Sequence, residues 1–242
     1  MSKKTSYLER LPTHAQKRGD IGKGEAQIIT RRREVDEIEA ECADALSGSA
    51  LGKGGKRIGI LLEDEVRMVV RDPVRYPSGK SKCQMRIIGK TEYGGVSGVV
   101  VLPMLEGRFV LREIYRHPTR AWELEAVRGR RETGQTSRQT AHMEVKQELG
   151  YQLRKLHPLG KICPDSAILS SVLDIFLGEL KDGPREDEPE PTEAFGEIHY
   201  LTPEEFADRI RKGRVRDSYT IAALAMAELR GLIAPIRPPA TT

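Results

Sequence analysis

The sequence is poor in cysteine, in aromatic residues and in long hydrophobic runs. Its three cysteines, Cys42, Cys83 and Cys163, are isolated and odd in number, which excludes a disulfide framework and a C-x-x-C metal site and indicates buried or idle thiols. No run approaches the 18 apolar residues of a membrane helix, and the polar N-terminus is not followed by the apolar core of a secretory signal. We therefore expect a cytoplasmic protein that makes no contact with a membrane.

Other familiar signals are also missing. The five histidines show no metal-ligand spacing, and the glycines at 52–56 lack the spacing and the following Ser or Thr of a P-loop. Charged residues are abundant, but 40 Lys and Arg against 36 Asp and Glu leave a net charge of only +4, mixed along the chain. Because the charges are mixed along the chain, the small positive excess gives only weak support to nucleic-acid binding, and nucleic acid is not expected as the main partner.

What the sequence does contain is a strand, loop and helix unit between Trp122 and Tyr151. An apolar, β-prone run leads into a loop rich in Gly and Arg, and a segment with helical periodicity then ends at Gly150. Thr136 or Ser137 can N-cap this helix, because a hydroxyl there accepts a bond from an otherwise orphan backbone N–H. Gly150 tolerates the left-handed position that follows a helix.

Two carboxylates run along the predicted helix. Ala141, Val145 and Leu149 form one apolar stripe, and Glu144 and Glu148 lie one turn apart beside it. Like charges at this spacing disfavour an isolated helix by about 0.2–0.5 kcal/mol, so the pair favours either solvent or a bound cation. Oxygen ligands of this kind suit Mg²⁺ or Mn²⁺, whereas a solvated helix face is the alternative interpretation of two glutamates alone.

The residues around this pair resemble the Nudix box, G-x5-E-x7-R-E-U-x-E-E-x-G-U, in which U is a bulky aliphatic residue. The matching positions are Gly129, Glu144, Val145, Glu148 and Gly150. The sequence departs from the pattern at three positions, where the box has Glu, Arg and Glu and this chain has Gln135, Met143 and Gln147.

The strands before and after the box extend the resemblance to the ADP-ribose pyrophosphatases. V-V-V-L-P (99–103), F-V-L-R-E-I-Y-R (109–116) and W-E-L-E-A-V-R-G (122–129) look like the strands that lead into the box in those enzymes. G-E-I-H-Y-L-T-P-E-E-F (196–206) and S-Y-T-I-A-A-L-A-M-A-E-L (218–229) look like their last strand and closing helix. The resemblance implies the Nudix fold, an α/β (α+β) sandwich with a mixed sheet flanked by helices.

The composition along the chain suggests four segments. Residues 1–56 read as a polar arm that is mobile or docked on a partner, a helix over about 33–47 and a flexible Gly- and Ser-rich linker. Short β-branched runs over 57–96 predict a small N-terminal antiparallel β domain. Residues 97–232 form the expected Nudix domain, with a central, almost continuously apolar strand in 167–180. Residues 233–242 form a tail that we expect to be disordered.

The resemblance also implies roles for particular side chains. Glu144 and Glu148 would hold Mg²⁺ or Mn²⁺, helped by the backbone carbonyl at Arg128 or Gly129 and by the neutral oxygen of Gln147. Met143 cannot make the hydrogen bonds of the usual arginine, so we expect weaker metal binding or slower turnover.

Substrate contacts and the base follow from the same resemblance. Arg116, Glu125 and Arg128 are the expected substrate-binding residues, and an arginine near a diphosphate supplies charge-assisted, often bidentate bonds. The base would be a glutamate of the acidic loop at 181–193, with Glu193 and Glu190 the best candidates. Trp122 is expected to pack in the core rather than to stack on adenine. The acidic loop as a whole could instead be merely a solvated charge run.

The sequence therefore predicts an Mg²⁺-dependent hydrolase that splits the diphosphate of ADP-ribose, an NAD-like dinucleotide or a nucleoside diphosphate sugar, releasing AMP. Two alternatives stay open: a catalytically weak Nudix domain that senses such a ligand, and a Nudix protein directed at RNA through the basic N-terminal arm. The resemblance further implies a homodimer in which residues of the 57–96 sheet contribute to the partner's pocket.

Overall fold

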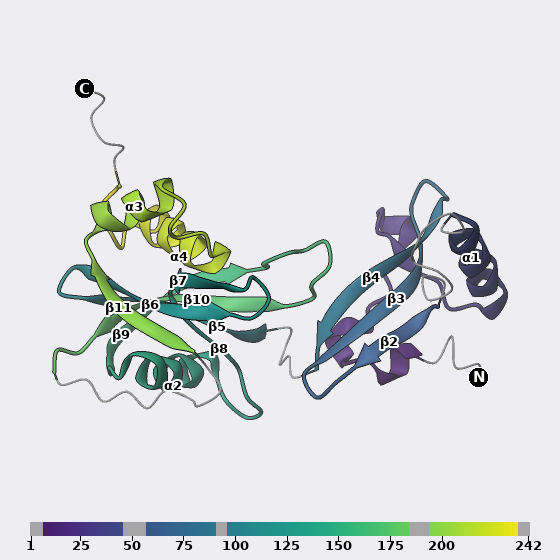
Figure 1. The fold of residues 1–242 in the computed structure, drawn as a ribbon. Helices are drawn as coiled ribbons and strands as arrows, with labels where there is room; N and C mark the ends of the chain where they lie inside the picture. Colours follow the sequence, from purple (N-terminus) through teal and green to yellow (C-terminus); the bar gives the residue numbers. More distant parts are fainter. Residues whose placement is uncertain (1–6, 46–56, 91–95, 184–193, 237–242) are drawn as a thin grey trace, which may run out of the picture. The chain divides into compact units, whose positions relative to one another are not determined.

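The computed structural model describes residues 7–45, 57–90, 96–183 and 194–236 (Figure 1). The chain divides into two compact units: Met1–Gly95 with Asp165–Ser171, and Val96–Pro164 with Val172–Thr242. Among the helices in the described part of the chain, none is long and apolar enough to cross a membrane.

The first unit is an antiparallel sheet covered by a helix. Strand β3 (Arg67–Arg75) pairs with β4 (Ser81–Gly89) along one edge and with β2 (Gly59–Glu63) and β1 (Gln27–Ile28) along the other. Helix α1 (Arg32–Ala45) packs on β3 and β4, and its Val35 and Ile38 join the buried side chains of the sheet. The segment Asp165–Ser171 adds a bridge from Leu169 to Ile87 in β4.

The described part of the predicted arm is folded rather than mobile, which corrects the expectation for residues 7–30. Three short 3-10 turns, η1 (Tyr7–Arg10), η2 (Thr13–Ala15) and η3 (Ile21–Lys23), bring the side chains of Tyr7, Leu8 and Leu11 into the core. The Tyr7 hydroxyl donates a 2.5 Å hydrogen bond to the buried Asp72 of β3. These turns are too short to produce a hydrophobic period, so the sequence pattern could not reveal them.

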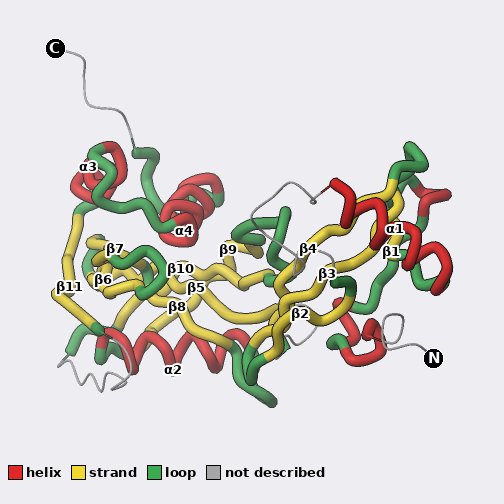
Figure 2. Tube along the Cα trace, turned by 45° about the vertical axis from the view of Figure 1, so that its right-hand side comes forward, coloured by secondary structure: helices red, strands yellow, loops and turns green. Residues whose placement is uncertain are grey.

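The second unit is a mixed sheet between two layers of helix (Figures 1 and 2). Its strand order is β11-β6-β5-β10-β9, with β7 paired to β6 and β8 paired to β5. The pairing of β5 with β10 is parallel, and the other pairings are antiparallel. The strands are β5 (Val96–Leu105), β6 (Arg108–Arg116), β7 (Ala121–Glu125), β8 (Val127–Arg130), β9 (Leu153–Ile162), β10 (Val172–Leu180) and β11 (Phe195–Leu201).

Each face of this sheet has its own hydrophobic core. Helix α2 (Ser137–Leu149) covers one face, and α3 (Pro203–Arg211) and α4 (Ser218–Leu229) cover the other. The central position predicted for the apolar strand is confirmed, since β10 lies between β5 and β9. Residues 96–103, which continue the series of short β-branched runs from 57, belong to this second sheet and not to the antiparallel sheet of the first unit.

Local signals fixed the helix ends. Thr136 is the N-cap of α2, with a reciprocal capping box to Gln139, and Gly150 follows the helix with φ 73°. Asp217 caps α4 by accepting a bond from the backbone N–H of Thr220. Of the tail at 233–242, Ile233 and Ile236 pack against the core, and residues 237–242 lie outside the described residues.

Candidate active site

The site begins with the two glutamates of α2. Helix α2 packs on β8, and the side chain of Glu144 lies directly over Gly129 in that strand. A Cβ at position 129 would stand 1.8 Å from both Cδ and Oε1 of Glu144, so only glycine leaves room for this carboxylate. Glu148 is 4% exposed, and its Oε1 accepts a 3.3 Å hydrogen bond from the backbone N–H of Arg128. Strand β8 thus places both carboxylates beside its own backbone.

These carboxylates line a small polar cavity of about 180 Å³. Its walls come from β8, the following loop, the last turns of α2 and the first residue of β11. The lining residues are Arg128, Gly129, Arg130, Glu132, Glu144, Gln147, Glu148 and Phe195. The structure therefore brings together all four residues predicted to hold a metal.

The donors in this cavity fit a hard divalent cation. Two carboxylates and the amide oxygen of Gln147 are oxygen ligands of the kind that Mg²⁺ and Mn²⁺ prefer. Gly129 lines the cavity as predicted, but its carbonyl oxygen lies toward Gly98 in the paired strand β5. Within the described residues no group of three His, Cys, Asp or Glu side chains is arranged to hold a metal ion. The neutral Gln147 stands where the box has a carboxylate, so a metal here would rely on two charged ligands and on neutral oxygens.

Two of the three departures from the box contact each other. The amide Nε2 of Gln135 lies 3.7 Å from Met143 Sδ, and the amide oxygen of Gln135 accepts a 3.0 Å bond from the Thr140 hydroxyl. A neutral contact between the loop and the helix therefore occupies the positions at which the box has a glutamate and an arginine.

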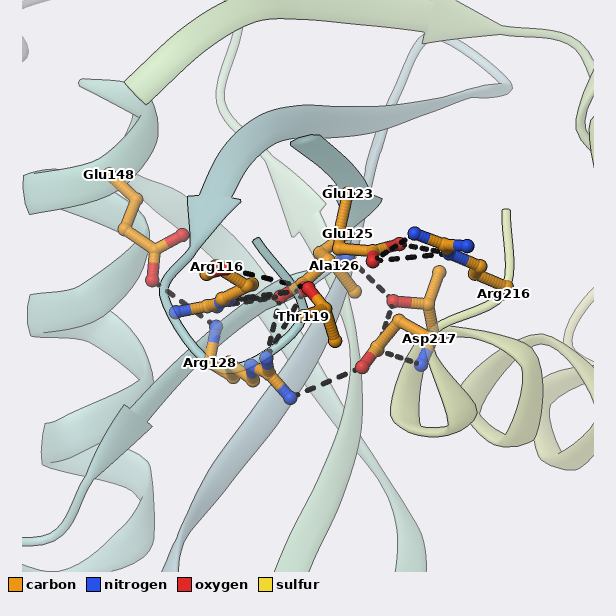
Figure 3. A network of polar contacts seen from close by, with 10 residues as sticks. Arg116, Thr119, Glu123, Glu125, Ala126, Arg128, Glu148, Arg216 and Asp217 are labelled. Carbon is orange, nitrogen blue, oxygen red and sulfur yellow. Dashed lines mark hydrogen bonds and ion pairs between the residues drawn. The ribbon is translucent and has the colours of Figure 1, made fainter. Parts of the chain in front are cut away.

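The predicted substrate-binding residues form an ion-pair network next to the carboxylates (Figure 3). Glu125 is 1% exposed and accepts hydrogen bonds from Arg116, the shortest at 2.6 Å, and from Arg128 at 3.2 Å. Arg128 also reaches Asp217, the cap of α4, at 3.2 Å. Burial raises the pKa of Glu125, and its hydrogen bond to Arg116 and the charge of Arg128 oppose that rise. Strands β6, β7 and β8 and helix α4 are therefore tied together at one buried carboxylate.

A second, larger cavity of about 650 Å³ lies on this network. Arg128 lines both cavities, so the larger one adjoins the carboxylate cavity. Its wall also holds Glu123 and Arg216, which form a bidentate pair at 2.7 and 2.8 Å. This hydrogen bond from Arg216 lowers the pKa of Glu123. The cavity thus offers both cationic and anionic groups next to the candidate metal ligands.

Some predicted residues behave differently from expectation, and others were missed. Trp122 is 53% exposed, at the start of β7, where its ring packs edge-on against Tyr115, so the expectation that it packs in the core is wrong. Glu190 and Glu193 lie outside the described residues, and their assignment as the base stays a prediction. Reasoning from sequence missed Asp217 as a partner of Arg128, although an aspartate directly before a helical segment was a usable signal for a residue held at a helix end. It also missed Arg112, for which no local signal exists.

Comparison with known proteins identifies this architecture. A profile of the NUDIX domain matches residues 95–224. An ADP-ribose pyrophosphatase of Bacillus subtilis (strain 168) is 25% identical over 176 residues, 73% of this chain and 88% of that protein. A methanol dehydrogenase activator of Bacillus methanolicus is 24% identical over 163 residues, 66% of this chain and 83% of that protein. The crystal structure of an ADP compounds hydrolase superposes with a TM-score of 0.60 at 19% identity, covering 73% of this chain and 93% of that one, and it confirms the predicted fold.

Proposed function

This chain belongs to the Nudix family and is a Nudix pyrophosphohydrolase of the ADP-ribose pyrophosphatase-like kind, and from that membership we propose its substrate, cofactor and product. The substrate is ADP-ribose, a related NAD-like dinucleotide or a nucleoside diphosphate sugar. The cofactor is Mg²⁺ or Mn²⁺, and the product is AMP.

The observation that carries this proposal is the close approach of Glu144 to Gly129 beside the buried Glu148. A glycine that leaves space for one carboxylate, next to a second, buried carboxylate, supports a cation site over a solvated helix face. When bound there, a divalent cation would neutralise phosphate charge and lower the pKa of a nearby water. Glu144, Glu148 and Gln147 are the side chains that would hold it, beside the backbone of Gly129.

The neighbouring arginines supply the remaining charge that a diphosphate requires. Arg116 and Arg128 hold their guanidinium groups against Glu125, which keeps both side chains in one orientation at the edge of the larger cavity. Planar guanidinium groups fixed in this way match the oxygens of a diphosphate through charge-assisted bonds. Glu125 then orients the arginines, and the cavity beyond them has room for the rest of a nucleotide.

The proposal is tested with a panel of ADP-ribose, NAD-like dinucleotides, nucleoside diphosphate sugars and capped RNA, with Mg²⁺ or Mn²⁺, read by mass spectrometry. Glu144→Gln and Glu148→Gln should each abolish hydrolysis while the thermal midpoint changes little, because each change removes metal charge and also relieves like-charge repulsion. Full activity in either variant would remove the metal assignment. Tight ligand binding without turnover would favour the sensor, and a steep salt dependence of RNA binding would favour an RNA substrate.

We propose in addition that the protein is a homodimer in which the 57–96 sheet contributes to the partner's substrate pocket. Light scattering at micromolar concentration should then give about twice the 27.1 kDa of one chain. A mass of a single chain would contradict this.

A further inference from the structure

Strand β6 carries one arginine among core residues. Arg112 is only 7% exposed, and its neighbours Val110 and Leu111 are fully buried. Because alternate residues of a strand share a face, Arg112 lies on the same side of the sheet as Val110, which packs in the core beneath α2. A guanidinium keeps its charge at every accessible pH and is costly to bury unless it is well bonded. Its partners therefore indicate what it does.

One partner of Arg112 is the end of helix α2. Its Nη1 donates a hydrogen bond to the backbone carbonyl of Glu148, the second-last residue of the helix. The last carbonyls of a helix accept no hydrogen bond from an N–H of the same helix, and they carry partial negative charge. A cation beside them is therefore favourable. Glu148 is thus held twice: its carbonyl by Arg112 and its carboxylate by the backbone N–H of Arg128.

A second contact of Arg112 is with the wall of the carboxylate cavity. The guanidinium lies 4.1 Å from the centre of the Phe195 ring, a cation–π contact. Phe195 is the first residue of β11 and lines the cavity with Glu144, Gln147 and Glu148. One side chain therefore contacts both the helix that carries the glutamates and another residue that lines their cavity.

We propose that Arg112 is a positioning residue for the metal site: by holding the last turn of α2 and the Phe195 ring, it sets the position of the Glu148 carboxylate. This inference rests on the proposed function, since it concerns the same site. A buried cation near a metal site would by simple repulsion weaken metal binding, so removal of Arg112 would tighten binding if the residue acted through charge alone.

The experiment measures Mn²⁺ affinity of the full chain by calorimetry, without substrate, for Arg112→Met, Arg112→Lys and Glu148→Gln. Arg112→Met should weaken Mn²⁺ binding by about 10–100-fold, the usual effect of losing a partner of a metal ligand, and Arg112→Lys should recover part of the loss because it retains a donor. Thr136→Ala is the matched control, since it removes the cap at the other end of the same helix. It should lower the thermal midpoint and leave Mn²⁺ affinity unchanged.

The outcomes separate the two proposals. If Glu148→Gln abolishes Mn²⁺ binding and Arg112→Met leaves it unchanged or tighter, the role of Arg112 is refuted and the proposed function stands. If Glu148→Gln itself leaves binding unchanged, the metal assignment and this inference both fail. Should Arg112→Met not fold, Phe195→Leu and Arg112→Lys decide the question, because both retain a cation at the helix end. Unchanged Mn²⁺ affinity in both would overturn the proposal.

Discussion

The sharpest prediction concerns a single methyl group at Gly129. A Cβ built at this position would lie 1.8 Å from Cδ and Oε1 of Glu144, whereas non-bonded carbon atoms settle at about 3.5–4.0 Å, so the carboxylate must move by roughly 2 Å. Since Mg²⁺ binds oxygen at about 2.0–2.1 Å, a displacement of this size removes Glu144 as a ligand. Gly129 has no positive φ, so alanine is acceptable to the backbone and the effect is one of space alone.

The expected result of Gly129→Ala is a folded protein with a damaged metal site. The obstructing atoms belong to the movable end of a side chain, so the thermal midpoint should change little. Loss of a residue that only holds a metal ligand typically weakens metal binding by roughly 10–100-fold. Loss of Glu144 itself should weaken it at least as much, and hydrolysis should fall with it. The assays are calorimetry with Mn²⁺ and turnover of the best substrate in the panel.

A glycine in the paired strand provides the contrast. At Gly98 of β5 a Cβ would lie 2.4 Å from the backbone carbonyl oxygen of Gly129, an atom that cannot rotate away. Gly98→Ala should therefore destabilise the fold by about 1–3 kcal/mol, or roughly 2–12 °C in the thermal midpoint. If Gly129→Ala kept full metal affinity and activity, Glu144 would not be a ligand in this position and the reasoning from space would be refuted.

Three further predictions concern charge. Gln147→Glu, alone or with Met143→Arg, should tighten Mg²⁺ binding by restoring charge and a brace around it, and an unchanged or lower affinity by calorimetry would count against this. Glu190→Gln or Glu193→Gln should lower kcat by about 10²–10⁴ while metal affinity is nearly kept, and if neither slows turnover at saturating substrate the base lies elsewhere. Because its arginine partner lowers the pKa of Glu123, Glu123→Gln should reduce the free energy of unfolding at pH 7, and the difference from wild type should shrink as the pH falls through the lowered pKa; a variant as stable as wild type at pH 7, or a difference that grows toward acid pH in chemical denaturation, would contradict this.

The parts of the fold that could be predicted are those with local causes. The caps at Thr136 and Gly150, the apolar stripe of α2 and the apolar run of β10 each depend on residues within a few positions of one another. The placement of Glu144 and Glu148, the two proposed metal ligands, belongs to the same class, because their spacing on a helix fixes their common direction. For these features the sequence pattern and the structure agree.

The parts that could not be predicted depend on contacts between distant residues. Glu123 and Glu125 are buried in β7, where alternation alone would place acids toward solvent, because arginines from other elements satisfy them. Trp122 shares its strand face with the buried Leu124, but it lies at the start of the strand, beyond the edge of the core. Neither fact is encoded in the spacing of residues within the strand.

The altered box is best understood by counting charges at the three departures. Replacement of a glutamate by Gln135 and of an arginine by Met143 leaves the local charge unchanged, and these two side chains contact each other. The third replacement, Gln147, removes one negative charge from the cavity and has no compensating change within the box. Metal affinity should therefore depend mainly on position 147, and most of the gain in the double variant should already be present in Gln147→Glu. An arginine placed at 143 without a glutamate at 135 would add an unmatched cation near the site, so the brace that it restores should contribute less than the charge restored at 147.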